Sequence, residues 1–255
     1  MPASLKLQEE YGDQIQVIFV ESQGATPAAA EKFAFQRSWL NGPSMWTSER
    51  PFDSGARGLP SFVLLSNEGE VLLKGNPMAM KGQIEEAVEA EVRKGKKAPE
   101  GTPKALEKAW KEFRKGEYSK AIVLAKKAGS KPEVAEDSAV AAELFEARAG
   151  AALDKVVWCM ENGYLTLAQE RLNVLTKSLK GQDELLARVS ALKQELESEA
   201  HEAEWAACKA FEKLMSKVNR KGADDRTAGS LDAIAEKHPG TKNGERAARM
   251  AGMLR

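Results

Sequence analysis

Short apolar runs alternate with helical patterns over the first 95 residues of the chain. Residues 14–21 read Gln-Ile-Gln-Val-Ile-Phe-Val-Glu, a β-branched and aromatic run that is typical of a buried parallel strand. A helical stub closed by Gly12 precedes this run. After it, Thr26-Pro27 begins a segment whose apolar residues recur at helical spacing. The order helix, strand, helix predicts an α/β arrangement.

A hairpin and a final helix are predicted next. The apolar runs 61–65 and 71–73 flank the turn signal Asn67-Glu68-Gly69, which favours two antiparallel strands. The stripe of Ile84, Val88 and Val92 then indicates a helix that packs on this sheet. Residues 94–103 are rich in Lys, Gly and Pro and mark the end of the domain.

Strand signals vanish beyond this point, and Ala, Leu, Glu and Lys dominate. About six or seven helices are predicted from the residues that interrupt the pattern: Gly116, Gly129 to Pro132, Asn162-Gly163, Gly181 and Gly222. Two apolar helix faces, which we call seams, should pack against each other in an antiparallel helical hairpin. One seam is Leu185, Val189, Leu192 and Leu196, and the other is Leu165, Leu172 and Leu175.

The length of 255 residues fits two domains better than one. We therefore expect an α/β domain over residues 1–95, a linker over 96–103 and an all-α domain over 104–255.

Charge and cysteine content exclude several classes of function. The 38 basic and 38 acidic side chains cancel, which argues against a nucleic-acid partner. No apolar run is long enough to span a membrane, and the first 25 residues lack the features of a secretion signal. Cys159 and Cys208 stand alone in helical patterns, so buried thiols are expected, with a bridge between them as the alternative. No cofactor or metal is predicted.

One stretch resembles a known family. The segment 58–65, Gly-Leu-Pro-Ser-Phe-Val-Leu-Leu, is similar to the Gly-Val-Pro-Thr strand of the thioredoxin superfamily, and Asn67 to Val71 with Gly75 is similar to the family's hairpin. Met1-Pro2 and Tyr11-Gly12-Asp13 resemble its TlpA-type branch of extracytoplasmic thiol-disulfide oxidoreductases. The resemblance implies a thioredoxin-like α/β fold that is incomplete at its N-terminus, and it implies a periplasmic location.

The resemblance also implies that the redox chemistry is missing. The family's Cys-x-x-Cys would lie just upstream of Met1, together with the strand that precedes it. Its reactive thiolate depends on a helix N-terminus that lowers the thiol pKa. One hypothesis is therefore that the chain is a fragment or mis-started reading of an oxidoreductase, redox-inactive as it stands.

Two of the three candidate site residues, Leu59 and Pro60, follow from the same resemblance, and the third, Trp46, lies where residues 39–57 depart from the family's pattern. Pro60 would be a cis proline that presents the backbone of Leu59 to a protein partner or a protein thiol substrate; the alternative is an ordinary trans proline at a strand edge. Trp46 lies with Trp39 and Phe52 in a long loop. These aromatic residues would either form a partner-docking surface near Pro60 or cover the core beneath the loop.

The helical region supports a second hypothesis, a non-catalytic protein-protein interaction module. Leu106 to Ala125 resembles one tetratricopeptide unit, and Leu231 to Ala247 resembles a second, weaker one. Such helices would offer a groove to a partner; the alternative is a helical bundle that supports the first domain.

Overall fold

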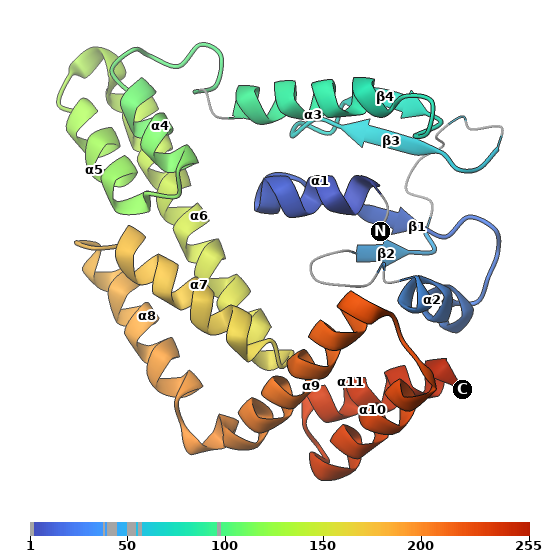
Figure 1. The fold of residues 1–255 in the computed structure, drawn as a ribbon. Coiled ribbons are helices and arrows are strands. Elements are labelled where there is room, and N and C mark those ends of the chain that lie inside the picture. The colour runs from blue at the N-terminus through green and yellow to red at the C-terminus, as the bar shows by residue number, and fades with distance from the viewer. Residues whose placement is uncertain (1–2, 38, 40–44, 50–54, 56–57, 96–97) are drawn as a thin grey trace. The chain divides into compact units, whose positions relative to one another are not determined.

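The computed structural model describes residues 3–37, 39, 45–49, 55, 58–95 and 98–255 (Figure 1). It is mainly helical, with 69% of residues in helices and 6% in strands. The chain divides into two compact units. The first unit comprises residues 1–94, 213–232 and 248–255, and the second comprises residues 95–212 and 233–247. Segments of the two units alternate along the sequence. The predicted division into a domain that ends at residue 95 and a helical domain that begins at residue 104 therefore stays a prediction.

The first unit contains short strands in two pairs. Helix α1 (Ala3–Tyr11) leads to β1 (Ile18–Val20), and α2 (Pro27–Gln36) leads to β2 (Met45–Thr47). β1 and β2 are parallel, with Phe19 opposite Trp46. At the start of α2, the hydroxyl of Thr26 accepts a hydrogen bond from the backbone N–H of Ala29 (3.3 Å), as the Thr-Pro signal predicts.

The predicted hairpin and helix follow. β3 (Phe62–Leu65) and β4 (Val71–Gly75) are antiparallel, with an irregularity at Leu64/Leu65. The hydroxyl of Ser66 shapes the turn by accepting from the backbone N–H groups of Glu68 (3.1 Å) and Glu70 (3.2 Å). Helix α3 (Lys81–Gly95) buries Val88 and Val92, two residues of its predicted stripe.

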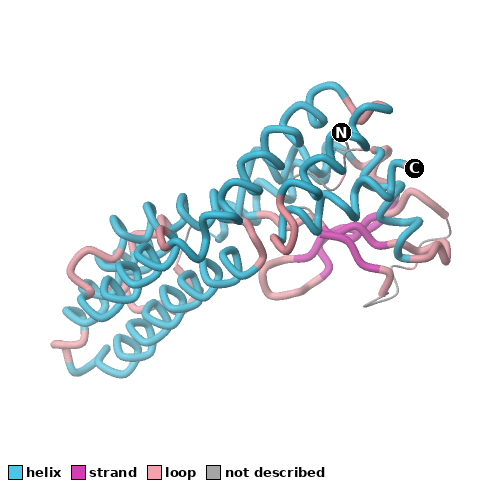
Figure 2. The backbone as a smooth tube through the Cα atoms, turned by 90° about the horizontal axis from the view of Figure 1, so that it is seen from below, coloured by secondary structure: helices cyan, strands magenta, loops and turns pink. Residues whose placement is uncertain are grey.

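The prediction of a thioredoxin-like α/β fold is wrong. The described strands make two sheets of two strands each, of three to five residues per strand, in a mainly helical chain. Figure 2 shows how small a part of the backbone is strand. The run that suggested a buried parallel strand leaves Ile18 and Val20 exposed. A β-branched run favours a strand, but only neighbouring strands can bury it.

Residues 98–255 contain eight α-helices rather than six or seven: α4 (Glu107–Arg114), α5 (Tyr118–Ala128), α6 (Ala135–Glu161), α7 (Leu165–Ser178), α8 (Asp183–Leu196), α9 (Glu202–Lys221), α10 (Asp225–Lys237) and α11 (Lys242–Leu254). Every predicted interruption falls between two of these helices. The turn between α8 and α9, with a 3-10 segment at Glu199–His201, was not predicted.

Two apolar clusters hold the second unit together. In the first, α4 and α5 bring small buried side chains, among them Ala109, Ala121 and Ala125, against α6. Phe145 of α6 stacks on Phe113 at 4.4 Å between ring centroids. The small side chains allow the close helix approach that the tetratricopeptide-like pattern predicts.

The second cluster joins α6, α7 and α8, and it includes residues from both predicted seams. Leu165, Leu172 and Leu175 of α7 are buried with Val189 and Leu196 of α8. Leu185 and Leu192 pack against them and are partly buried. The predicted packing of α7 on α8 is therefore confirmed.

Candidate functional site

The three site residues predicted from the sequence lie in two separate segments. Leu59 and Pro60 precede β3 and are exposed, and the peptide bond between them is cis, as the resemblance implies. Trp46 is half-buried in β2. Trp39 stacks on Phe19 at 5.2 Å between centroids, which favours the interpretation that it covers the core. Phe52 lies outside the described residues.

Both cysteines are free and buried, so the bridge between them is not formed. Burial raises the pKa of the Cys159 thiol and of the Cys208 thiol. The Cys208 thiol lies 3.5 Å from a carboxylate oxygen of Glu212 and 3.8 Å from the hydroxyl of Thr166. Because only the thiolate is strongly nucleophilic, these protonated thiols are suited to packing rather than to redox chemistry.

Two further observations concern the described residues only. In this part of the chain, no three or more His, Cys, Asp and Glu side chains are placed to hold a metal ion. None of its helices is long and apolar enough to cross a membrane.

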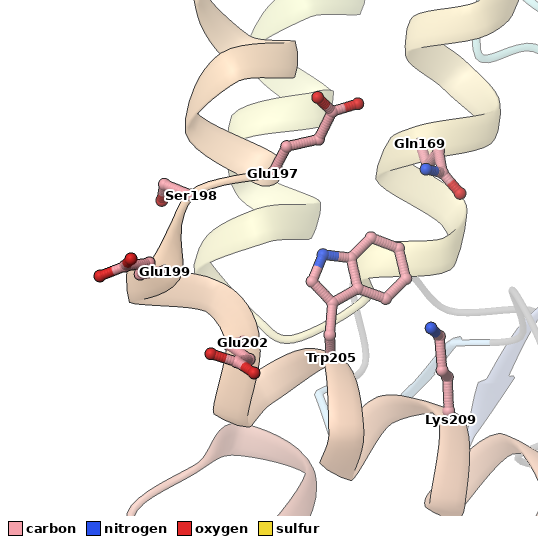
Figure 3. A pocket seen from close by; sticks show the side chains of 7 residues that line it. All are labelled: Gln169, Glu197, Ser198, Glu199, Glu202, Trp205 and Lys209. Carbon is pink, nitrogen blue, oxygen red and sulfur yellow. The ribbon is translucent and has the colours of Figure 1, made fainter.

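A shallow pocket lies at the turn that follows α8, and we call it the α8–α9 pocket. Trp205 forms its aromatic wall (Figure 3). The indole Nε1–H donates to the backbone carbonyl of Leu196 at 2.9 Å. Leu196 is the last residue of α8, where carbonyl groups have no partner within the helix. The indole therefore satisfies one of these groups and is held in a fixed orientation.

The pocket has a volume of about 390 Å³ and an acidic lining: Gln169, Glu197, Ser198, Glu199, Glu202, Trp205 and Lys209. Gln169 and Lys209 lie on one side of the indole, and Ser198, Glu199 and Glu202 lie on the other (Figure 3). The Lys209 ammonium lies 5.4 Å from the centroid of the Trp205 ring. Three carboxylates against one ammonium give the lining an excess of two negative charges.

A second surface, the α6–α7 stripe, consists of the large exposed side chains Trp158, Tyr164, Leu167 and Val174. Trp158 is 55% exposed and Val174 is 64% exposed. The rings of Trp158 and Tyr164 are stacked, with centroids 5.5 Å apart and planes 14° apart. The guanidinium carbon of Arg246 lies 4.2 Å from the Tyr164 centroid. The stripe is therefore an ordered aromatic and aliphatic surface.

A buried polar network supports the turn beneath this stripe. Asn243 is 1% exposed, and its amide nitrogen donates to the carbonyl of Gly163 and to the Glu204 carboxylate, each at 2.7 Å. Its amide oxygen accepts from Arg246 at 2.7 Å. Glu204 also accepts from the backbone N–H groups of Lys242 (2.6 Å) and Asn243 (3.0 Å), at the start of α11. These bonds tie the α6–α7 turn to α9 and α11.

No motif or spacing in the sequence singles out Trp205, Asn243 or Glu204 as site residues. Comparisons of the chain with protein-family models, with curated proteins and with solved structures find no match. Function is therefore argued from the chemistry of the pocket and the stripe.

Proposed function

We propose that the helical region is a non-catalytic protein-protein interaction module and that the α6–α7 stripe is its docking surface. The observation that carries this proposal is the exposure of four large side chains on adjoining helices. Tyr164 lies in the turn before α7, and Leu167 and Val174 lie in that helix. Their spacing of three and seven residues puts them on one helix face.

Ring contact between two of its members separates this surface from ordinary exposed apolar residues. Single exposed leucines or valines are common in soluble proteins and need no partner. Here Trp158 and Tyr164 are in ring contact, and Leu167 follows one turn later. Tryptophan and tyrosine are the residue types that most often contribute strongly to binding at protein interfaces.

The geometry favours a partner helix with an apolar face. The ten residue steps from Tyr164 to Val174 span about 15 Å at 1.5 Å per residue, which is about three helical turns. A partner helix could place side chains at i, i+3 and i+7 along this length. The buried thiols of Cys159 and Cys208 support a non-catalytic role because their pKa is raised.

Site-specific cross-linking tests this proposal. A photoreactive amino acid at position 174 should cross-link one defined protein in the native cells, and mass spectrometry identifies it. The purified partner is then titrated calorimetrically with Leu167→Lys/Val174→Lys. We expect at least a tenfold loss of affinity, because two buried contacts are replaced by desolvated charges.

Val140→Lys is the matched control, since Val140 is an exposed valine of α6 outside the stripe. Its affinity for the partner should stay within about twofold of the wild type, as expected for a surface change away from the interface. Equal losses in the control and in the double variant, or no defined cross-linked protein, would contradict the proposal.

Membership of the thiol-disulfide oxidoreductase family stays a prediction that rests on the local resemblance of residues 58–75 and of Met1-Pro2 and Tyr11-Gly12-Asp13. Intact mass and N-terminal sequencing of the endogenous protein test it. A longer chain with Cys-x-x-Cys before Met1 would support the prediction, and a product that begins at Met1 or Pro2 would contradict it.

A further inference from the structure

The geometry of the α8–α9 pocket points to a binding site for an arginine side chain of a basic peptide segment, with Lys209 as a tethered competitor for that site. This inference goes beyond the proposed function, because none of its residues belongs to the α6–α7 stripe.

The first step is the fixed orientation of the aromatic wall. The edge of the Trp205 indole is bound to Leu196 through the Nε1–H, and the ring packs against the core formed by α6, α7 and α8. The half-buried ring nevertheless lines the pocket. Among aromatic side chains, the indole of tryptophan binds cations most strongly. Because this indole is already held in one orientation, little conformational entropy of its side chain is lost when a ligand binds.

The second step is the charge of the lining. Within the described residues, Glu197, Glu199 and Glu202 form no ion pair with any cation. By contrast, Glu112 and Glu117 of α4 and the following turn are each paired with a lysine. The carboxylates of the pocket can therefore accept hydrogen bonds from an incoming cation, while they repel phosphate groups.

The third step concerns the cation that is already present. The Lys209 ammonium lies 5.4 Å from the Trp205 centroid, within the range of a cation–π contact. The ring therefore accepts a cation in this geometry. Lys209 lies four residues after Trp205 on α9, and its flexible stem allows it to leave. A cation that takes the same position over the ring must displace this ammonium.

The fourth step selects arginine. A planar guanidinium can stack on the indole face where Lys209 lies and extend its N–H groups across the ring toward the carboxylates on the other side (Figure 3), whereas an ammonium is a compact point charge. A volume of about 390 Å³ exceeds what one guanidinium needs and leaves room for the flanking peptide. The site therefore fits an arginine within an extended basic segment.

The test uses a fluorescein-labelled decapeptide of alternating arginine and glycine, titrated with the full chain and followed by fluorescence anisotropy. Replacing each arginine by citrulline, which is isosteric and uncharged, should abolish binding. Glu202→Gln and Trp205→Ala should each weaken binding about two- to fivefold, the range for exposed ion pairs and cation–π contacts. Trp205→Phe keeps an aromatic wall if the alanine variant fails to fold.

Lys209→Gln gives the decisive measurement, because removing the competitor should tighten binding about two- to fivefold. Two controls match the charge changes: Lys213→Gln lies one turn further along α9, and Glu195→Gln lies on α8 outside the lining. Neither control should change the affinity by more than about 1.5-fold at moderate salt, where distant charges are screened.

Three outcomes would overturn the inference. Lys209→Gln could leave the affinity unchanged or lower it, Lys213→Gln could tighten binding equally, or Glu195→Gln could weaken binding as much as Glu202→Gln. The stripe variant Leu167→Lys/Val174→Lys should bind the arginine peptide as the wild type does. Failure of the docking surface and failure of this pocket are therefore distinguishable.

Discussion

Replacement of Asn243 by alanine should lower the free energy of unfolding of the second compact unit by about 3 kcal/mol. The side chain is 1% exposed and takes part in three hydrogen bonds of 2.7 Å, to Gly163, Glu204 and Arg246. Each buried bond contributes about 1 kcal/mol net, and the groups left behind cannot reach water easily. The backbone bond from Asn243 to Glu204 is retained in the variant.

Urea denaturation followed by far-ultraviolet circular dichroism measures this loss. With a denaturant dependence of about 2 kcal/mol per molar urea, the midpoint should fall by about 1.5 M. Asn162→Ala is the matched control, because the Asn162 amide donates only to the exposed carbonyl of Trp158, at 2.8 Å. We expect a loss under about 0.5 kcal/mol for the control. Equal midpoints for the two variants would refute the assignment of Asn243 as a structural link.

Three further predictions concern a glycine substitution, cysteine labelling and the pH dependence of stability. Gly163→Ala should destabilise by about 2–3 kcal/mol in the same urea assay, because φ is +74° and a Cβ would lie 2.8 Å from both a Glu204 oxygen and the Lys242 Cβ. Gly181→Ala, at φ +90° with its nearest atom 3.9 Å away, should lose only about 1 kcal/mol; an equal loss would exclude the crowding argument. Neither Cys159 nor Cys208 should react with iodoacetamide at neutral pH until urea unfolds the chain, and mass spectrometry that finds either one labelled in the native protein would contradict their burial. Since the fold raises both thiol pKa values, their contribution to stability is complete below the unfolded pKa of about 8.5 and is lost as pH rises through the folded values, which urea midpoints over that range can follow.

Local signals in the sequence predicted most helix boundaries. Gly116, Gly163 and Gly181 each lie just beyond the end of a helix, in a backbone conformation that glycine adopts readily. The seam of Leu185 to Leu196 was predictable for a similar reason, because helical periodicity alone decides which residues share a face. Both inferences depend on neighbours within a few residues.

The fold of residues 1–95 was not predictable in this way. The motif at Gly58 to Gly75 predicted the β3–β4 hairpin, and the stripe of Ile84, Val88 and Val92 predicted the following helix; both elements form. Whether β1 joins that hairpin in one sheet depends on pairing between distant segments, and a local run carries no information about such pairing. The resemblance therefore identified local elements and misidentified their assembly.

The sequence does not predict the α8–α9 pocket, because the turn between α8 and α9 contains no glycine or proline. From Asp183 to Lys221 the residues read as one long helix, because the range contains no glycine or proline and Ser198 is no less favourable in a helix than Ser190 or Ser216. The interruption becomes stable because the indole of Trp205 donates to the terminal carbonyl of α8, which the continuous helix would have satisfied by a backbone N–H. The hydrogen bond that ends α8 thus also places the aromatic wall in the pocket. Local helix propensity favours a continuous helix here, whereas the candidate site requires an interruption. Trp205, the side chain that stabilises this interruption, is also the one proposed to bind the cation.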